Sequence, residues 1–148
     1  VPSWLYEVKA GGTSIWERWD ALRPDGTVNL GKDPGSGLIN AVGGGMVSFN
    51  HYANGAVGDW LYRRVAGLEA IEPGYKKFKV APLVGGGLTS VSCFKKLSSG
   101  TIKINWNFEN GVFVLSINVP FNTSAVITLP DGKSLEVSSG KYVYSVEM

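Results

Sequence analysis

Two residue types that build many catalytic and metal sites are scarce in this sequence. It has one cysteine and one histidine in 148 residues. A single cysteine excludes an internal disulfide, and one histidine with scattered acids lacks the spacing of a metal site. Cys93 lies in an alternating run, so we expect a buried or half-buried structural thiol. The sequence indicates no cofactor and no metal, and it leaves any calcium dependence open.

Clustered charge and long apolar runs are also lacking. Charged residues make up 18% of the chain, and 14 basic and 12 acidic residues give a net charge of +2. A nucleic-acid partner needs a basic stripe, and a membrane span needs about 18 consecutive apolar residues. We therefore expect no nucleic-acid or membrane partner. The start, "VPSWLYEV", has no signal-peptide pattern and no initiator methionine, so we expect a piece of a longer chain whose compartment, cytoplasmic or exported, is undetermined.

Glycine, by contrast, is abundant and marks the organisation of the chain. There are 20 glycines, about twice the usual share of ~7%. Residues 33–45 and 82–90 are the richest stretches, and both are typical of loops. The pattern is helical or irregular before residues 73–80 and strand-like after them. We therefore predict two parts, residues 1–77 and 78–148.

The first part contains two predicted helices. A short one begins at Ser3 as N-cap and ends at Gly11, with an apolar stripe of Trp4, Leu5 and Val8. The strongest helical pattern covers residues 48–69, with Ser48 as N-cap and apolar residues at three- and four-residue spacing. Its apolar arc is wide, so we expect it to be covered on more than one side. On its exposed side, Asp59 and Arg63 are four residues apart and can form a solvated pair.

The second part is typical of an antiparallel β-sandwich. Seven short runs of β-branched or aromatic residues alternate with turn signals, at 77–83, 88–96, 100–109, 111–120, 124–130, 133–139 and 141–147. Asn110-Gly111 predicts a hairpin, and Pro130-Asp131-Gly132 predicts a type I turn followed by a left-handed residue. Tyr142 and Tyr144 share one face of the last strand, where they either pack or stack on a sugar.

The stretch "WERWD" is the best candidate for chemistry. The chain lacks the serine-hydrolase elbow and the phosphate-binding glycine motifs. Glu17 lies between Trp16 and Trp19, which offer apolar platforms for a sugar beside an acid–base carboxyl group. The alternative is a surface pair of Glu17 and Arg18 over a tryptophan core. His51, at the start of the predicted helix, either bonds a ligand hydroxyl or caps that helix.

Two long stretches of the sequence resemble a known family. They are "TSIWERWDALRPDGTVN" (13–29) and "MVSFNHYANGAVGDWLYRRVAGLEAIEPGYKKFKVAPLVGGGLTSV" (46–91). In this order they resemble the C-terminal end of bacterial α-L-rhamnosidases of glycoside hydrolase family 78, and a looser similarity continues through the β-rich tail. The resemblance implies an α+β chain: the closing helices of an (α/α)6 barrel followed by a small antiparallel β-sandwich. It also implies removal of terminal α-L-rhamnose from glycosides or polysaccharides, with inversion at the anomeric carbon.

The resemblance also assigns roles to single residues. Glu17 matches the general base that activates water, and His51 matches a histidine of the rhamnose pocket. Trp16, Trp19 and Asn50 are implied as neighbours of the substrate. The segment 30–45 is longer than the family's usual spacer at this place.

The general acid of the family lies upstream, in sequence that this chain does not contain. Twelve barrel helices need roughly 200 residues or more, and residues 1–77 are too few. We therefore expect the chain to need an upstream part of the catalytic domain and to be inactive alone. We also expect it either to self-associate through its apolar helix or to bury that helix against the sandwich. A carbohydrate-binding sandwich and a purely structural accessory domain stay open as alternatives.

Overall fold

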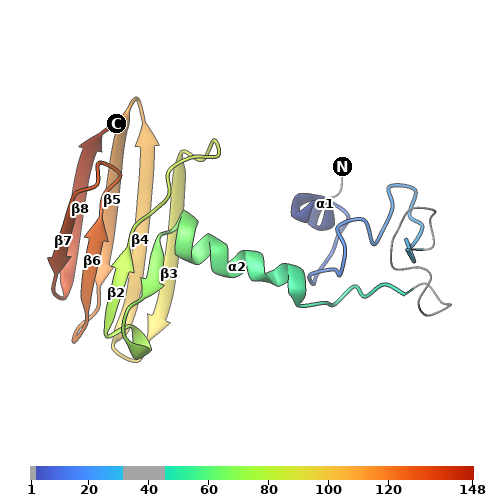
Figure 1. The fold of residues 1–148 in the computed structure, drawn as a ribbon, viewed down its shortest axis with the longest axis horizontal. Coiled ribbons are helices and arrows are strands. Elements are labelled where there is room, and N and C mark those ends of the chain that lie inside the picture. The colour runs from blue at the N-terminus through green and yellow to red at the C-terminus, as the bar shows by residue number, and fades with distance from the viewer. Residues whose placement is uncertain (1–2, 32–45) are drawn as a thin grey trace. The chain divides into compact units, whose positions relative to one another are not determined.

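A computed structural model describes residues 3–31 and 46–148 (Figure 1). The chain forms two compact units, residues 1–57 and 58–148. This division precedes the boundary expected near residue 78, because the segment before that residue already contributes a strand to a sheet. The loop predicted at 33–45 lies outside the described residues.

Helix α1 spans Trp4–Lys9 and has the ends that the sequence predicts. The Ser3 side chain accepts a hydrogen bond from the Tyr6 N–H at 3.1 Å, which satisfies one of the free donors of the first turn. Gly11 follows the helix with φ of 82°, in the left-handed region that terminates helices. The Ser3 cap and the Gly11 stop are confirmed.

The side of α1 that is buried differs from the predicted one. Leu5 and Val8 are 72% and 70% exposed, whereas Glu7 is only 4% exposed. The apolar stripe therefore faces outward in this chain, and a carboxyl group faces inward. Helical periodicity identifies a stripe, but the contacts available decide which side is covered.

The second helix is shorter than predicted and changes its winding. It runs as a 3₁₀ turn (η1, Ala53–Ala56), an α-helical turn (α2, Val57–Trp60) and a π-helical turn (η2, Leu61–Val65). The predicted start with Ser48 as N-cap is wrong, because residues 48–51 pair with an earlier segment instead. The predicted end at residue 69 is wrong as well.

Gly67 ends this helix. Its φ is +81°, and a Cβ placed on it would lie 2.3 Å from the nitrogen of Pro82. Its carbonyl accepts the Ala81 N–H at 2.9 Å, so two backbones meet where only a glycine fits. The chain then continues as a strand.

Two four-stranded sheets make up the second unit (Figure 1). One has the order β1-β2-β6-β7, with β1 Leu68–Ala70, β2 Lys77–Val80, β6 Ser124–Thr128 and β7 Ser134–Val137. The other has the order β3-β4-β5-β8, with β3 Ser90–Leu97, β4 Gly100–Glu109, β5 Val112–Val119 and β8 Gly140–Glu147. All seven predicted strands are confirmed, and β1 was missed because it was assigned to the helix. A 3₁₀ turn, η3 (Pro73–Tyr75), joins β1 to β2.

The strand directions follow the predicted architecture with one difference. All pairings within the sheets are antiparallel except that of β2 with β6, which is parallel. The chain leaves the first sheet after β2, builds three strands of the second, and returns as β6 alongside β2. The alternation of apolar and polar residues along a strand does not reveal that β6 returns to pair with β2.

The core lies between the sheets, where alternate residues of the strands meet. Trp106 of β4 is fully buried, and its indole N–H donates to the Val65 carbonyl at 2.9 Å, which ties the sheet to the end of η2. The fully buried side chains come from both sheets and are Phe78, Val80, Ile102, Ile104, Trp106, Phe113, Leu115, Ala125 and Ile127. One continuous apolar cluster therefore holds the sandwich together.

The predicted turns and the tyrosine pair are resolved. Asn110 and Gly111 have φ of 52° and 77°, as the hairpin signal requires, and Gly132 has φ of 87°. Tyr142 and Tyr144 stack at a centroid distance of 6.3 Å and pack against the core. Their observed role is packing.

The outer surface of the second helix is partly apolar. Trp60 and Leu61 are 51% and 48% exposed, while Arg63 forms the predicted solvated pair with Asp59 at 2.8 Å. Self-association through the apolar residues stays a prediction. None of the helices in the described residues is long and apolar enough to cross a membrane.

We predict that Gly67→Ala destabilises the second unit by more than about 3 kcal/mol, because it adds a backbone overlap to the strain of a positive φ. The matched control is Gly74→Ala, since Gly74 has φ of +68° but nothing within 4 Å of an added Cβ. This control should cost about 1 kcal/mol. Urea unfolding followed by circular dichroism measures both, and equal losses would contradict the role of the Ala81–Pro82 contact.

Candidate active site

A short backbone pairing brings the predicted site residues together. The Glu17 N–H donates to the Ser48 carbonyl at 2.9 Å, and the His51 N–H donates to the Ile15 carbonyl at 2.8 Å. The Ser14 hydroxyl donates to the Phe49 carbonyl at 2.5 Å. Residues 14–17 and 48–51 therefore run alongside each other, so Glu17 and His51 belong to one structural element.

The Glu17 side chain adds a further hydrogen bond between the two paired segments. Its Oε2 atom accepts the Ser48 N–H at 2.7 Å, so Glu17 binds the same residue through its main chain and its carboxylate. The side chain is half-buried. The Ser48 hydroxyl in turn accepts the Asn50 N–H at 3.2 Å. The carboxylate is thus fixed in one orientation, as an acid–base group requires.

Asn54, at the start of the second helix, also holds the 14–17 segment. The sequence did not lead us to select this residue. Its side-chain amide donates to the carbonyls of Trp16 and Glu17 at 3.2 and 3.1 Å. The signal was a polar amide among the small residues of η1, a place where an unpartnered amide would be costly. The backbone of Glu17 is therefore held by two partners, Ser48 and Asn54.

The two tryptophans have different environments. Trp16 is 4% exposed and meets Tyr6 and Phe49 edge-on, at centroid distances of 6.4 and 5.2 Å. Trp19 is 38% exposed and meets Trp4 edge-on at 4.9 Å. Trp16 is thus a packing residue behind Glu17, and Trp19 offers accessible aromatic surface.

Arg18 does not pair with Glu17. Its guanidinium donates to the Asn29 carbonyl and lies 3.9 Å from the Asp20 carboxylate. Asn29 is itself buried, and its amide donates to Asp20 at 2.9 Å. The alternative of a Glu17–Arg18 surface pair is therefore wrong, because Arg18 is engaged on its own side of the segment.

His51 and Asn50 lie just before the second helix. The Nδ1 atom of His51 accepts the Ala53 N–H at 3.4 Å, and its ring stacks on Tyr52 at 5.5 Å. His51 is not the N-cap of this helix, which is Tyr52, but its Nδ1 bonds the first residue of η1. Neutral imidazole then carries its proton on Nε2, which stays able to donate to a ligand hydroxyl. The Asn50 side chain is exposed.

Glu7 is a second buried carboxyl group near this segment that the sequence reasoning did not select. Its Oε2 atom accepts the Trp16 N–H at 3.3 Å, and its Oε1 atom is buried without a hydrogen-bond partner among the described residues. Glu7 thus holds the residue that precedes Glu17. No helical pattern signals an inward carboxyl group on an otherwise ordinary surface helix.

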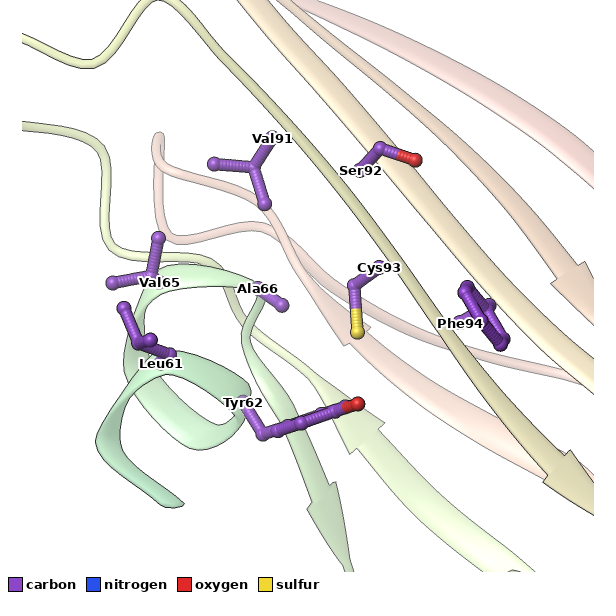
Figure 2. A pocket seen from close by; sticks show the side chains of 8 residues that line it. All are labelled: Leu61, Tyr62, Val65, Ala66, Val91, Ser92, Cys93 and Phe94. Atoms are coloured by element: carbon purple, nitrogen blue, oxygen red, sulfur yellow. The ribbon is translucent and has the colours of Figure 1, made fainter. Parts of the chain in front are cut away.

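A hollow of about 440 Å³ lies in the second unit and contains none of the predicted site residues (Figure 2). Leu61, Tyr62, Val65 and Ala66 line it from the helix, and Val91, Ser92, Cys93 and Phe94 from β3. The Cys93 sulfur faces Tyr62, and burial raises the pKa of this thiol. A lining without a carboxyl group or an imidazole has no acid–base pair for glycoside hydrolysis.

The described residues contain no group of three His, Cys, Asp or Glu side chains placed to hold a metal ion.

Comparison with known proteins identifies the family. Residues 67–143 match the model of the bacterial alpha-L-rhamnosidase C-terminal domain, and residues 1–65 match that of the bacterial alpha-L-rhamnosidase 6 hairpin glycosidase domain. The chain belongs to the bacterial α-L-rhamnosidase family. The break between the two matches falls where Gly67 ends the second helix.

Individual α-L-rhamnosidases agree with this assignment. The α-L-rhamnosidase of Streptomyces avermitilis is 36% identical over 87% of this chain, which spans 11% of that protein. The crystal structure of the Aspergillus terreus enzyme matches 99% of this chain with a TM-score of 0.82 and 39% identity, and the chain covers 16% of it. The S. avermitilis enzyme complexed with L-rhamnose matches 99% of the chain with a TM-score of 0.80 and 33% identity, and the chain covers 15% of that structure.

We predict that Asn54→Ala speeds hydrogen exchange at the amides of Glu17 and Ser48 by about ten-fold or more. The variant removes two hydrogen bonds from the backbone of the 14–17 segment, and lost bonds of this kind cost about 1–3 kcal/mol. Asn50→Ala is the matched control, because the exposed Asn50 side chain makes no hydrogen bond among the described residues. Equal exchange in the two variants would show that Asn54 does not hold the segment.

Proposed function

We propose that this chain supplies the general base, Glu17, of an inverting α-L-rhamnosidase whose upstream residues complete the active site. The proposal rests on one observation above all: the Glu17 carboxylate is fixed by the Ser48 N–H on Oε2 at 2.7 Å. No hydrogen bond occupies Oε1 among the described residues. One oxygen thus orients the group, and the other is available to a water molecule.

The proposed reaction needs a second carboxyl group. In inverting hydrolysis, an acid protonates the leaving oxygen while a carboxylate roughly 6.5–9.5 Å away removes a proton from the attacking water. The water oxygen forms a bond to the anomeric carbon as the bond to the aglycone oxygen breaks. Glu17 takes the water proton, and rhamnose leaves with inverted configuration. We assign the general acid to the upstream part of the catalytic domain.

The neighbours of Glu17 have distinct proposed roles. His51 offers Nε2 to a rhamnose hydroxyl, because its Nδ1 is engaged by the Ala53 N–H. Trp19 and Asn50 are exposed and line the substrate, whereas Trp16 supports Glu17 from the buried side. The residues before the sheets form the closing helices of the (α/α)6 barrel, and the sheets form the C-terminal sandwich.

The assignment of Glu17 as a general base is favoured over the alternative in which the tyrosines of β8 bind a sugar. Tyr142 and Tyr144 pack against the core of the sandwich, and the Tyr142 hydroxyl donates to the Ser138 carbonyl at 3.0 Å. Engaged in this way, the two rings do not make a free stacking platform. Support for the rhamnoside substrate comes from the named activity of the relatives.

We predict that Glu17→Gln, made in the longer enzyme that carries this chain, lowers kcat on an aryl α-L-rhamnoside at least about a hundredfold. The amide keeps an oxygen for the Ser48 N–H, so the melting temperature should stay within about 2 °C of the wild-type value. Glu72→Gln, at an exposed position, serves as the control.

Two outcomes would overturn the assignment. One is turnover that persists in Glu17→Gln, or that falls only together with stability. The other is α-L-rhamnose as the first product in a proton NMR time course, since inversion must give the β anomer first.

We further predict that the 148-residue chain alone releases no measurable aryl alcohol from the same substrate, because a base without its acid lacks half of the machinery. The longer enzyme assayed under identical conditions is the control. Steady release by the chain alone, lost in Glu17→Gln, would show that the general acid lies within these residues.

A further inference from the structure

The outer face of the sheet β3-β4-β5-β8 carries a groove that has no part in the proposed reaction. Two depressions of about 410 and 370 Å³ lie side by side there and share Thr101, Asn118 and Lys141. The first extends over Lys103 and Asn105, and the second extends to the loop after β5. The shared residues make the two depressions one continuous surface.

Strand register places two lysines in one row across this groove. Lys103 of β4 pairs with Asn118 of β5, and Asn118 pairs with Lys141 of β8. Residues opposite each other on neighbouring strands share a face, so both ammonium groups stand on the outer side with an amide between them. Asn105 and Ser116 form the next row.

At this end of the sheet face, the positive charges of the lysines are not balanced by acidic side chains in the part of the chain that the structure describes. Lys103 and Lys141 are exposed, and neither makes an ion pair among the described residues. The acids on the same face, Glu109 and Glu147, stand six residues further along their strands, about 20 Å away at 3.3 Å per residue. A ligand carboxylate would meet two free ammonium groups and no like charge.

The amide side chains of the groove are oriented. The Asn118 amide donates to the Thr101 carbonyl at 2.7 Å, and the Asn105 carbonyl oxygen accepts the Ser92 hydroxyl at 2.7 Å. Asn105 therefore keeps its N–H₂ group available, and Asn118 keeps its carbonyl oxygen available. One donor and one acceptor beside the lysines suit the hydroxyl groups of a sugar.

An exposed aromatic ring borders the second depression. Phe121 is 80% exposed, although it follows the buried Pro120. The loop that carries it is fixed, because the Thr123 hydroxyl donates to the Pro120 carbonyl at 2.7 Å. An accessible ring on an anchored loop is suited to stacking on the apolar face of a sugar.

We propose that this groove binds an acidic oligosaccharide, a chain of sugars that carry uronic-acid carboxylates. Lys103 and Lys141 bind the carboxylates, Asn105 and Asn118 bind hydroxyl groups, and Phe121 stacks on a ring. The site is separate from Glu17 and would position an acidic polymer on the sandwich. It uses none of the residues assigned to hydrolysis.

The test is titration of tetragalacturonate into the 148-residue chain by calorimetry and by NMR chemical shifts. Binding should be detected at low salt, with shifts centred on Lys103, Asn118 and Lys141, and should weaken above about 0.5 M salt. Maltotetraose, a neutral chain of equal length, should bind at least ten-fold more weakly. Tetraglutamate, a peptide of equal charge, should also bind at least ten-fold more weakly, because it offers neither sugar hydroxyls nor a stacking face.

Variants assign the binding to the groove. Lys103→Gln with Lys141→Gln should weaken tetragalacturonate at least about ten-fold, since charge-assisted hydrogen bonds are lost. The control is Lys79→Gln with Lys133→Gln, which removes the same charge from exposed positions outside the groove. Phe121→Ala should weaken binding while leaving unfolding unchanged, because the side chain is exposed.

Three results would overturn the proposal: no binding of tetragalacturonate, equal binding of tetraglutamate, or equal losses in the two lysine pairs. Each is independent of Glu17, so a failure here leaves the proposed hydrolytic function untouched.

Discussion

The first unit depends on a double attachment between Glu17 and Ser48. The backbone of Glu17 donates to Ser48, and the backbone of Ser48 donates to the Glu17 carboxylate. The residue proposed to carry the chemistry is thus also the residue that joins two distant segments. A catalytic side chain mounted on irregular backbone needs such support, because it lacks the regular hydrogen bonds of a helix or a strand. Asn54 and Glu7 add to that support through hydrogen bonds to the backbone of Trp16 and Glu17.

The second unit depends on a different constraint, the meeting of two alternating surfaces. Trp106 and Phe113 face the core from neighbouring strands, while Lys103 and Ser116 face outward from the same strands. One sequence pattern therefore produces both a sealed interior and a polar face that is available for ligands. Gly67 connects this architecture to the helix, since it lets the chain leave the helix at the point where β1 begins.

The limits of sequence reasoning follow from these two constraints. Strand alternation is local, so every strand with a clear period of two was found, as were the turns at Asn110 and Gly132. The bounds of the second helix were wrong because distant contacts decide them: Ser48 pairs with Glu17, and Gly67 meets Pro82. Glu17 and His51 were candidates from the residues themselves, and the family resemblance assigned their roles. Asn54 and Glu7 were missed because their importance lies in what they touch, which no spacing reveals.

The parallel pairing of β2 with β6 has a consequence for how the sandwich forms. The hairpins β3-β4 and β4-β5 join neighbouring stretches of chain, and each can close by itself. The β2–β6 pair joins Lys77 to Ser124, with three whole strands between them. Because closing a long loop costs entropy before its contacts stabilise it, we expect the sheet built from β3, β4 and β5 to form first and the other sheet to close against it.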